Sequence, residues 1–266
     1  MRLILLLLLS THLFSQTKKL DTVFCDCNLA KVIAVNSKTI YGKTIAPKGF
    51  GEIKEISPSK QKTTYAFEKE HNSAWYKLII NMTGELTMNI TPTKADDDYD
   101  FMLFKATKNN FCDSLQTHKI NPVRACISRD KEELNGKTGL NFKSTNEFVK
   151  YGVGAAYCKS LAVKKGEIYY LVLDNVYEKG DGHTLEFEIS QAVLFKGTVT
   201  DDNDKPIQAE IALTNQKGDT VTIEKTDAIG NYSFMAPLTK NQAYNLNFYN
   251  DSSFSFTKSV TLADTA

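Results

Sequence analysis

Short segments in which apolar and polar residues alternate recur along most of the chain, and this period of two restricts the fold more than any other feature. Thr184–Ile189 alternates strictly, as expected of an antiparallel strand with one face in solvent. Ile168–Leu173 is almost continuously apolar, which predicts a strand buried on both faces. Helical periodicity is confined to one short candidate, Asp21–Ala34. The pattern therefore predicts an all-β protein.

The N-terminus predicts export from the cytoplasm. Arg2 is followed by the apolar run Leu3–Leu9 and then by the small residue Ser15 ahead of a polar stretch. This order is that of a secretory signal peptide, and the apolar core is shorter than the roughly 20 residues that a membrane-spanning helix needs. We expect residues 1–15 to be the signal peptide and the mature chain to contain no transmembrane segment. The mature protein is then periplasmic, outer-membrane-associated or extracellular.

The charge balance argues against a nucleic-acid partner. The chain holds 32 Lys and Arg residues against 31 Asp and Glu residues, and removal of Arg2 with the signal peptide would leave the two signs equal in number. Binding to nucleic acid needs a basic face. Envelope proteins or glycans are the partners that we expect instead.

A second folding unit is predicted to begin near Gln191. From Val193 onward, short strand segments follow one another at regular spacing, separated by turn clusters such as Asp201–Pro206. We therefore place a first β-sandwich domain at residues 16–190 and a smaller one at residues 191–266. The boundary has no linker rich in Pro, Gly or Ser, so we expect the two domains to be closely joined.

The second unit carries a recurring order of glycine, proline and aromatic positions. The residues concerned are Gly197–Val199, Asp201–Ile207, Ala209–Leu213 and Thr226–Phe234. In this order the unit resembles the carboxypeptidase-regulatory-like module of the transthyretin type. The resemblance implies a prealbumin-like β-sandwich that is not itself an enzyme.

A second set of segments lies in the first unit, namely Phe67–Lys77, Gly84–Leu86, Asp98–Phe104 and Gly166–Asn175. With these segments the unit resembles the jelly-roll sandwich of pre-peptidase C-terminal domains in exported proteins of Bacteroidetes-type bacteria. Similar pairs of domains form the N-terminal regions of some outer-membrane-protein-A-type envelope proteins, which continue into a peptidoglycan-binding domain. This sequence stops at Ala266, as a short form or as a truncated chain.

The densest acidic cluster lies between Asp96 and Asp100. Asp96, Asp98 and Asp100 alternate, so an extended backbone would place them on one face, and Asp174 at the end of another strand could join them. Ca²⁺ binds several carboxylate and carbonyl oxygens at once. We therefore predict a calcium site formed by these four residues. The alternative is a solvated loop whose Asp side chains accept hydrogen bonds from turn amides.

Two further groups of residues allow both a functional and a structural interpretation. His71, beside Glu70, has the chemistry of a metal ligand or a base, but a satisfied surface or edge histidine is the favoured interpretation. A set of aromatic residues could stack on sugars, although aromatic residues in strands more often form a core. These residues are Trp75, Tyr76, Tyr169 and Tyr170.

Five cysteines in an exported chain predict disulfides, and the odd number leaves at least one thiol unpaired or paired with another chain. Cys112 and Cys126 flank a short loop within one domain, and we predict a disulfide between them. Cys158 is then expected to be free or joined to Cys25 or Cys27.

These features predict a non-catalytic accessory protein of the cell envelope or surface, which acts in binding, presentation or assembly. The alternative is a carbohydrate-binding fragment or accessory module of an exported hydrolase. The sequence offers no paired motif for acyl transfer, phosphoryl transfer or zinc hydrolysis, so we expect no enzyme activity.

Overall fold

The protein is all-β and sandwich-like, as predicted from its sequence. A computed structural model describes residues 24–261, except 62–66, 68, 108–109, 118–119, 129–132, 153–154, 240 and 251–252, and it describes the backbone alone at 253–255. The predicted signal peptide, residues 1–15, lies outside the described residues. No helix in the described part of the chain is long and apolar enough to cross a bilayer.

The described elements are the 3-10 helix η1 (Cys27–Leu29), the helix α1 (Phe111–Thr117) and the strands β1 (Lys31–Val35), β2 (Lys38–Tyr41), β3 (Ser73–Ile80), β4 (Gly84–Pro92), β5 (Tyr99–Lys105), β6 (Arg124–Cys126), β7 (Thr138–Asn141), β8 (Phe148–Val149), β9 (Tyr157–Lys159), β10 (Leu161–Val163), β11 (Ile168–Asn175), β12 (His183–Thr198), β13 (Glu210–Asn215), β14 (Thr220–Lys225), β15 (Asn231–Thr239), β16 (Ala243–Asn250) and β17 (Ser253–Thr261).

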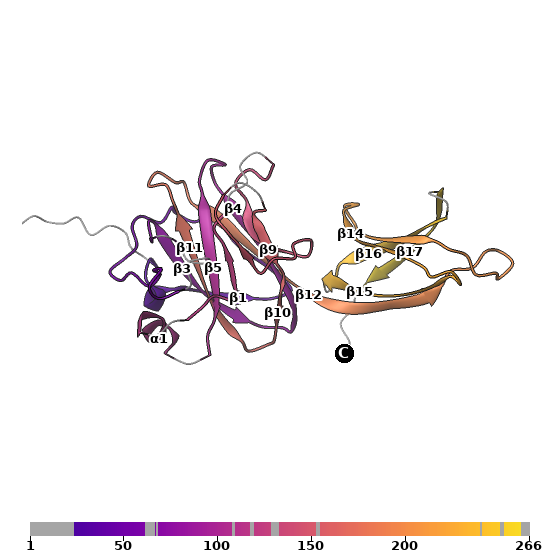
Figure 1. Ribbon diagram of the computed structural model, residues 1–266, viewed down its shortest axis with the longest axis horizontal. Helices are drawn as coiled ribbons and strands as arrows, with labels where there is room; N and C mark the ends of the chain where they lie inside the picture. Colours follow the sequence, from indigo (N-terminus) through magenta and orange to yellow (C-terminus); the bar gives the residue numbers. More distant parts are fainter. Residues whose placement is uncertain are drawn as a thin grey trace, which may run out of the picture.

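The first unit consists of two sheets packed face to face (Figure 1). One sheet has the strand order β1-β3-β11-β5-β6-β8, and the other is built from β2, β4, β7, β9, β10 and the first half of β12. The core between them contains side chains from both sheets, among them Leu78, Phe101, Leu171 and Phe187.

The six-stranded sheet is also covered on its outer face. Along β3, Tyr76 enters the core between the sheets, whereas Trp75 joins a separate apolar cluster on the opposite side. Phe111 of α1 and Ile56 of the segment between β2 and β3 complete this outer cluster. Burial on both faces explains the continuous apolar run at Ile168–Leu173, and the buried strand predicted there is confirmed as β11.

Strand β12 is 16 residues long and belongs to both units. It pairs with β4 from His183 to Ser190 and with β15 from Ser190 to Thr198. In the second unit, β12 and β15 face the sheet β14-β13-β16-β17 across a core that includes Phe195 and Phe248. The boundary predicted at residues 190 and 191 therefore falls inside a strand. The result is an elongated molecule with the second unit at one end (Figure 1).

Helical structure differs from the sequence prediction. In the candidate Asp21–Ala34, the described part contains only the short η1, and β1 begins at Lys31 and pairs in parallel with β3. The buried residues of β1 are Ile33 and Val35, which have the spacing of a strand. The helix α1 lies outside the one helical candidate of the sequence, because seven residues are too few to show helical periodicity.

The disulfide predicted between Cys112 and Cys126 is wrong. Cys112 is bonded to Cys27, with the two Cα atoms 5.6 Å apart. The reason is the direction of the side chains, because Cys126 enters the core between the sheets while Cys27 and Cys112 lie with the outer cluster. Cys158 is free, as one of the predicted possibilities had it. Cys25 and Cys126 are free as well, and all three are buried.

Candidate functional site

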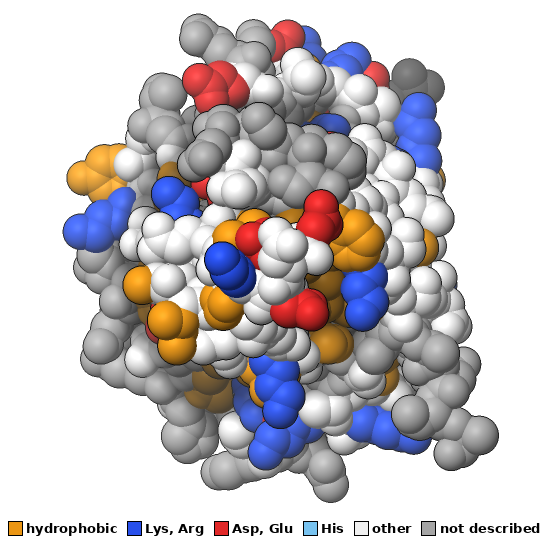
Figure 2. Space-filling model, turned by 90° about the vertical axis from the view of Figure 1, so that its right-hand side faces the viewer, with side chains coloured by type: hydrophobic (Ala, Val, Ile, Leu, Met, Phe, Trp, Pro, Cys, Tyr) orange, Lys and Arg blue, Asp and Glu red, His pale blue; other side chains and the backbone are white. Residues whose placement is uncertain are grey.

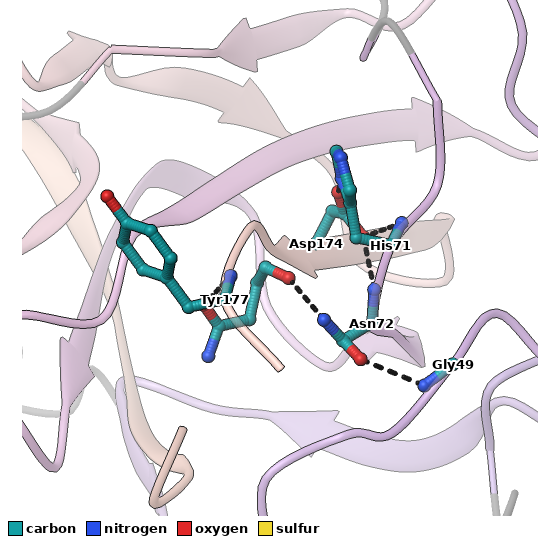
Figure 3. A network of polar contacts seen from close by, with 6 residues as sticks. Gly49, His71, Asn72, Asp174 and Tyr177 are labelled. Carbon is teal, nitrogen blue, oxygen red and sulfur yellow. Dashed lines mark hydrogen bonds and ion pairs between the residues drawn. The ribbon is translucent and has the colours of Figure 1, made fainter. Parts of the chain in front are cut away.

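Polar side chains gather where β3 begins and β11 ends (Figure 3). His71 and Asn72 come directly before β3, and Asp174 and Asn175 end β11. The two strands are antiparallel neighbours, with Ser73 opposite Asp174. The sheet register therefore brings together residues that are about a hundred positions apart in the sequence.

Asp174 is the centre of this network, and its side chain is fully buried. Its Oδ1 accepts hydrogen bonds from the backbone N–H of His71 at 2.7 Å and of Asn72 at 2.8 Å. Its Oδ2 lies 2.7 Å from Nδ1 of His71. These contacts satisfy a carboxylate whose burial would otherwise be costly. His71 is 26% exposed and is held by Asp174, which matches the structural interpretation of this residue.

Asn72 extends the network to two loops. Its Oδ1 accepts a hydrogen bond from the backbone N–H of Gly49 at 2.9 Å, and its Nδ2 donates to the backbone oxygen of Asn175 at 2.8 Å. Oδ1 of Asn175 in turn accepts from the backbone N–H of Tyr177 at 3.1 Å. Figure 3 shows these contacts tying the segment between β2 and β3 to the end of β11. The network therefore anchors loops.

The four aspartates predicted to bind calcium are brought together only in part. Asp100 stands opposite Asp174 in the register of β5 and β11. Burial, together with the charges of Asp98 and Asp174, raises the pKa of Asp100 well above its usual range, which favours the uncharged acid. Asp96 is exposed in the turn before β5. Within the described ranges, no three His, Cys, Asp or Glu side chains are arranged to hold a metal ion, and calcium binding stays a prediction.

Two glutamates, Glu55 and Glu70, are buried, and nothing in the sequence indicates their burial. Oε1 of Glu55 accepts a hydrogen bond from the backbone N–H of Cys27 at 2.8 Å, and Oε1 of Glu70 accepts from that of Ile56 at 3.1 Å. Neither Oε2 has a hydrogen-bond partner among the described residues. Burial raises the pKa of Glu55 to about 7, and burial with the charge of Glu55 raises the pKa of Glu70 to about 9. Near neutral pH Glu70 is therefore largely protonated, and Glu55 is only partly ionised, which makes both poor ligands for a cation. Their hydrogen bonds hold the segment between β2 and β3 in place.

All four aromatic residues considered for stacking on sugars belong to the buried clusters. Trp75, Tyr76 and Tyr169 are at most 1% exposed, and Tyr170 is 9% exposed. Tyr170 also lines a surface cavity of about 200 Å³, and its ring stacks on Phe111 with the centroids 4.7 Å apart. Burial of these residues matches the structural interpretation.

The cavity at Tyr170 combines an aromatic wall with polar groups. Thr107 and Glu167 also line it, and Nζ of Lys77 lies 5.9 Å from the centroid of the Tyr170 ring. The Glu167 carboxylate is already engaged, because it binds the Lys105 ammonium and accepts a hydrogen bond from the Tyr169 hydroxyl. Lys77 and Thr107 are therefore the side chains best suited to meet a small polar ligand.

The second unit exposes apolar side chains on the outer face of β12 and β15. Leu194 and Met235 stand opposite each other across the two strands and are 52% and 58% exposed. Ala192 and Pro237 form the next pair on the same face. Figure 2 looks at the molecule from the end of the second unit and shows apolar side chains exposed among charged ones. We refer to these four residues as the apolar face. Contiguous apolar surface of this kind is typical of an interaction site.

The sequence matches no family model and no curated protein. Among solved structures, a surface-associated copper-binding protein, CorA of Methylomicrobium album BG8, is 10% identical over 61% of this chain and 98% of that chain, with a TM-score of 0.27. The adhesin domain of Epf from Streptococcus pyogenes is 10% identical over 86% of this chain and 92% of that chain, with a TM-score of 0.22. A glycosyl hydrolase family 2 member from Bacteroides cellulosilyticus is 10% identical over 71% of this chain and 28% of that chain, with a TM-score of 0.19. Likenesses this remote carry no conclusion about function.

Proposed function

We propose that this chain is an exported, non-catalytic accessory protein of the cell envelope or surface, which binds, presents or assembles a partner. The observation that carries the proposal is the apolar face on the outer side of β12 and β15, where Leu194 and Met235 are more than half exposed. Neighbouring apolar side chains left in water can serve contact with another molecule.

The connection between the two units supports the same function. β12 passes from one unit to the other without a loop, so the second unit is held at a fixed distance from the first. A rigid spacer suits presentation better than a flexible linker does. The disulfide between Cys27 and Cys112 supports export, because disulfides persist mainly in oxidising compartments.

Cosedimentation with the envelope fraction of the producing cells tests this proposal. Leu194→Glu combined with Met235→Glu should reduce the bound fraction about tenfold, because two charges replace the apolar contact. Gln216→Glu combined with Thr220→Glu is the matched control, since both residues are exposed near β14 and the added charge is the same. Equal binding of both double variants would contradict the proposal, as would turnover of glycans or peptides by the purified chain.

The alternative function, a carbohydrate-binding fragment or accessory module of an exported hydrolase, draws support from the cavity at Tyr170. A glycan array distinguishes it. If the cavity binds sugar, Lys77→Ala and Thr107→Ala should each remove the signal, whereas Leu194→Glu with Met235→Glu should leave it unchanged. An array without any signal eliminates this alternative.

A further inference from the structure

Strand β12 has one unpaired edge in the second unit. Val199 donates its N–H to the backbone oxygen of Gly230 at 2.8 Å, on the side of β15, and the register of β12 with β15 is continuous. Because backbone groups of a strand point to alternate sides, the odd-numbered positions face β15 and the even-numbered positions face away from it. On that far side, β4 pairs with β12 only as far as Ser190. Among the described residues, no strand pairs with the outward backbone groups of Ala192, Leu194, Lys196 and Thr198.

The facing sheet extends beyond this edge. β14 lies against β15, so in the order β14-β13-β16-β17 the strand β17 projects past the open side of β12. Phe256 and Lys258 of β17 stand opposite the buried Phe248 and Leu246, so their side chains point to the inner side of the sandwich. Phe256 is nevertheless 56% exposed, and Lys258 is exposed as well. Val260 on the same face packs against the core, so the inner face of β17 is left open at Phe256 and Lys258.

The space beside β12 and under β17 suits a single extended strand. Neighbouring strands in a sheet lie about 4.8 Å apart, so a strand added to β12 would lie below Phe256 and Lys258. A second copy of this chain fits poorly, because its own β12 would bring a four-stranded sheet into the space that β17 occupies. Lys258 and Lys196 are exposed on either side of this space, and their charges favour an acidic residue in the occupant.

We propose that the edge of β12 from Ala192 to Thr198 is an acceptor site for an extended strand of a partner protein. The partner strand has apolar side chains at alternate positions, which cover Phe256, and an acidic residue beside Lys258. Main-chain hydrogen bonds to β12 supply affinity, and the alternate side chains supply specificity. This inference rests on the proposed function and names the class of partner.

A display library of linear decapeptides with alternating apolar positions is the probe, selected on the full chain. Ala192→Pro removes one outward N–H and leaves the pairing with β15 intact, since proline is tolerated on an open edge. Ala192→Ser is the matched control, because it keeps that N–H. The selected peptides should carry apolar residues at alternate positions and an acidic residue. They should bind Ala192→Pro about tenfold more weakly than the wild type, as expected for one lost main-chain hydrogen bond. Ala192→Ser should bind like the wild type, and scrambled peptides should not bind.

Hydrogen exchange measured by NMR tests the same edge of β12 independently of the peptide library. In the free protein, the amides of Leu194, Lys196 and Thr198 should exchange fast, while those of Val193 and Phe195 are protected by β15. Bound peptide should protect the first set. Protection of Val193 and Phe195 in Ala192→Pro shows that this variant remains folded.

Three outcomes overturn the inference. The first is that selection yields only peptides that bind Ala192→Pro as well as the wild type. The second is that the even-numbered amides of the free protein are already protected. Loss of that protection in a chain ending at Thr261 would assign it to residues 262–266, and protection that rises with protein concentration would assign it to a second copy. The third is that no peptide is selected. Envelope binding that persists in Ala192→Pro but is lost in Leu194→Glu with Met235→Glu would then refute the strand acceptor alone and leave the proposed function standing.

Discussion

The two units bury their sheets in different ways. In the first unit, a six-stranded sheet is covered on both faces, and the outer cover is fixed by the Cys27–Cys112 disulfide and by hydrogen bonds to the buried Asp174. In the second unit, two strands face four, and the sequence from Gln191 to Ala266 contains no cysteine. The first unit therefore fixes its outer layer with a covalent bond and with hydrogen bonds to a buried carboxylate, whereas the second leaves backbone groups along one edge of β12 without a partner strand among the described residues. Exposed strand edges are what proteins use for pairing with another chain.

Removal of the disulfide should have the largest effect, and it should be confined to the first unit. Cys27→Ser with Cys112→Ser opens a cross-link between residues 85 positions apart, which corresponds to about 4–5 kcal/mol of unfolding free energy in the chain-entropy model. Trp75 is the single tryptophan and lies in the cluster beside the disulfide, so urea unfolding followed by its fluorescence reports this unit. Hydrogen exchange in β16 should stay unchanged. An equal loss there would show that the two units unfold together.

The strands themselves were predictable because their pattern is local. The alternation at Thr184–Ile189 and the apolar run at Ile168–Leu173 reflect one-sided and two-sided burial, and both appear as strands. The continuity of β12 was not predictable, since Gln191 and Ala192 interrupt its apolar pattern. The core-facing residues of β12 before this point belong to the core of the first unit, and those after it belong to the core of the second.

The contacts of Asp174, Cys112 and Glu55 were predictable only in part, because each depends on a partner that is distant in the sequence. Asp174 was singled out by its place after a strand, but its contact with His71 follows from the register of β3 and β11. Cys112 was assigned the wrong partner, since sequence spacing does not show on which face of a sheet a cysteine lies. Glu55 is polar in a segment without periodicity, and nothing in the sequence shows that folding buries it.

Asp174→Asn should cause the next largest loss. The substitution weakens the hydrogen bonds to the backbone of His71 and Asn72 and removes the carboxylate that contacts Nδ1 of the His71 ring, all within a buried site. We expect the unfolding free energy of the first unit to fall by about 3 kcal/mol in urea titration. Asp181→Asn is the control, because its ion pair with Lys94 is about half exposed and screened by solvent, so its loss should change the unfolding free energy very little. Similar losses in both variants would argue against internal anchoring.

Calcium would add a further anchor to the first unit. If the predicted site binds, the unfolding free energy should rise by about 2.7 kcal/mol at a calcium concentration a hundredfold above Kd. Thermal scans with calcium and with a chelator measure this shift. Asp98→Asn with Asp100→Asn should abolish it. An unchanged midpoint in the wild type would eliminate the site and leave Asp96, Asp98 and Asp100 as a turn and strand entry.

The buried glutamates should make the first unit sensitive to alkaline pH. Because the folded protein raises the pKa of Glu55 to about 7 and of Glu70 to about 9 from a usual value of 4.5, it binds protons more tightly than the unfolded chain. The stabilising contribution of these groups is therefore fully present below pH 4.5 and is lost as the pH rises toward 9. We expect a loss of at least about 2 kcal/mol between pH 5 and pH 9 by Trp75 fluorescence, because one pKa unit corresponds to about 1.4 kcal/mol. Glu70→Gln should remove much of this slope, and an equally steep slope in that variant would refute the assignment.

Phe256→Ser should have the smallest effect on stability, and it tests whether the inner face of β17 is uncovered at this position. The ring stands at the inner face of β17 but is 56% exposed, so its truncation should cost at most about 1 kcal/mol. Phe248→Ser provides the contrast, because Phe248 is buried on the neighbouring strand and its loss should cost about 3 kcal/mol or more. Hydrogen exchange of the β13 amides measures the unfolding free energy of the second unit in both variants. If the two substitutions cost the same, a covering element already buries Phe256 in solution, and the second unit is as closed as the first. If they differ as expected, the free energy that Phe256 does not contribute to folding remains available for binding a partner strand.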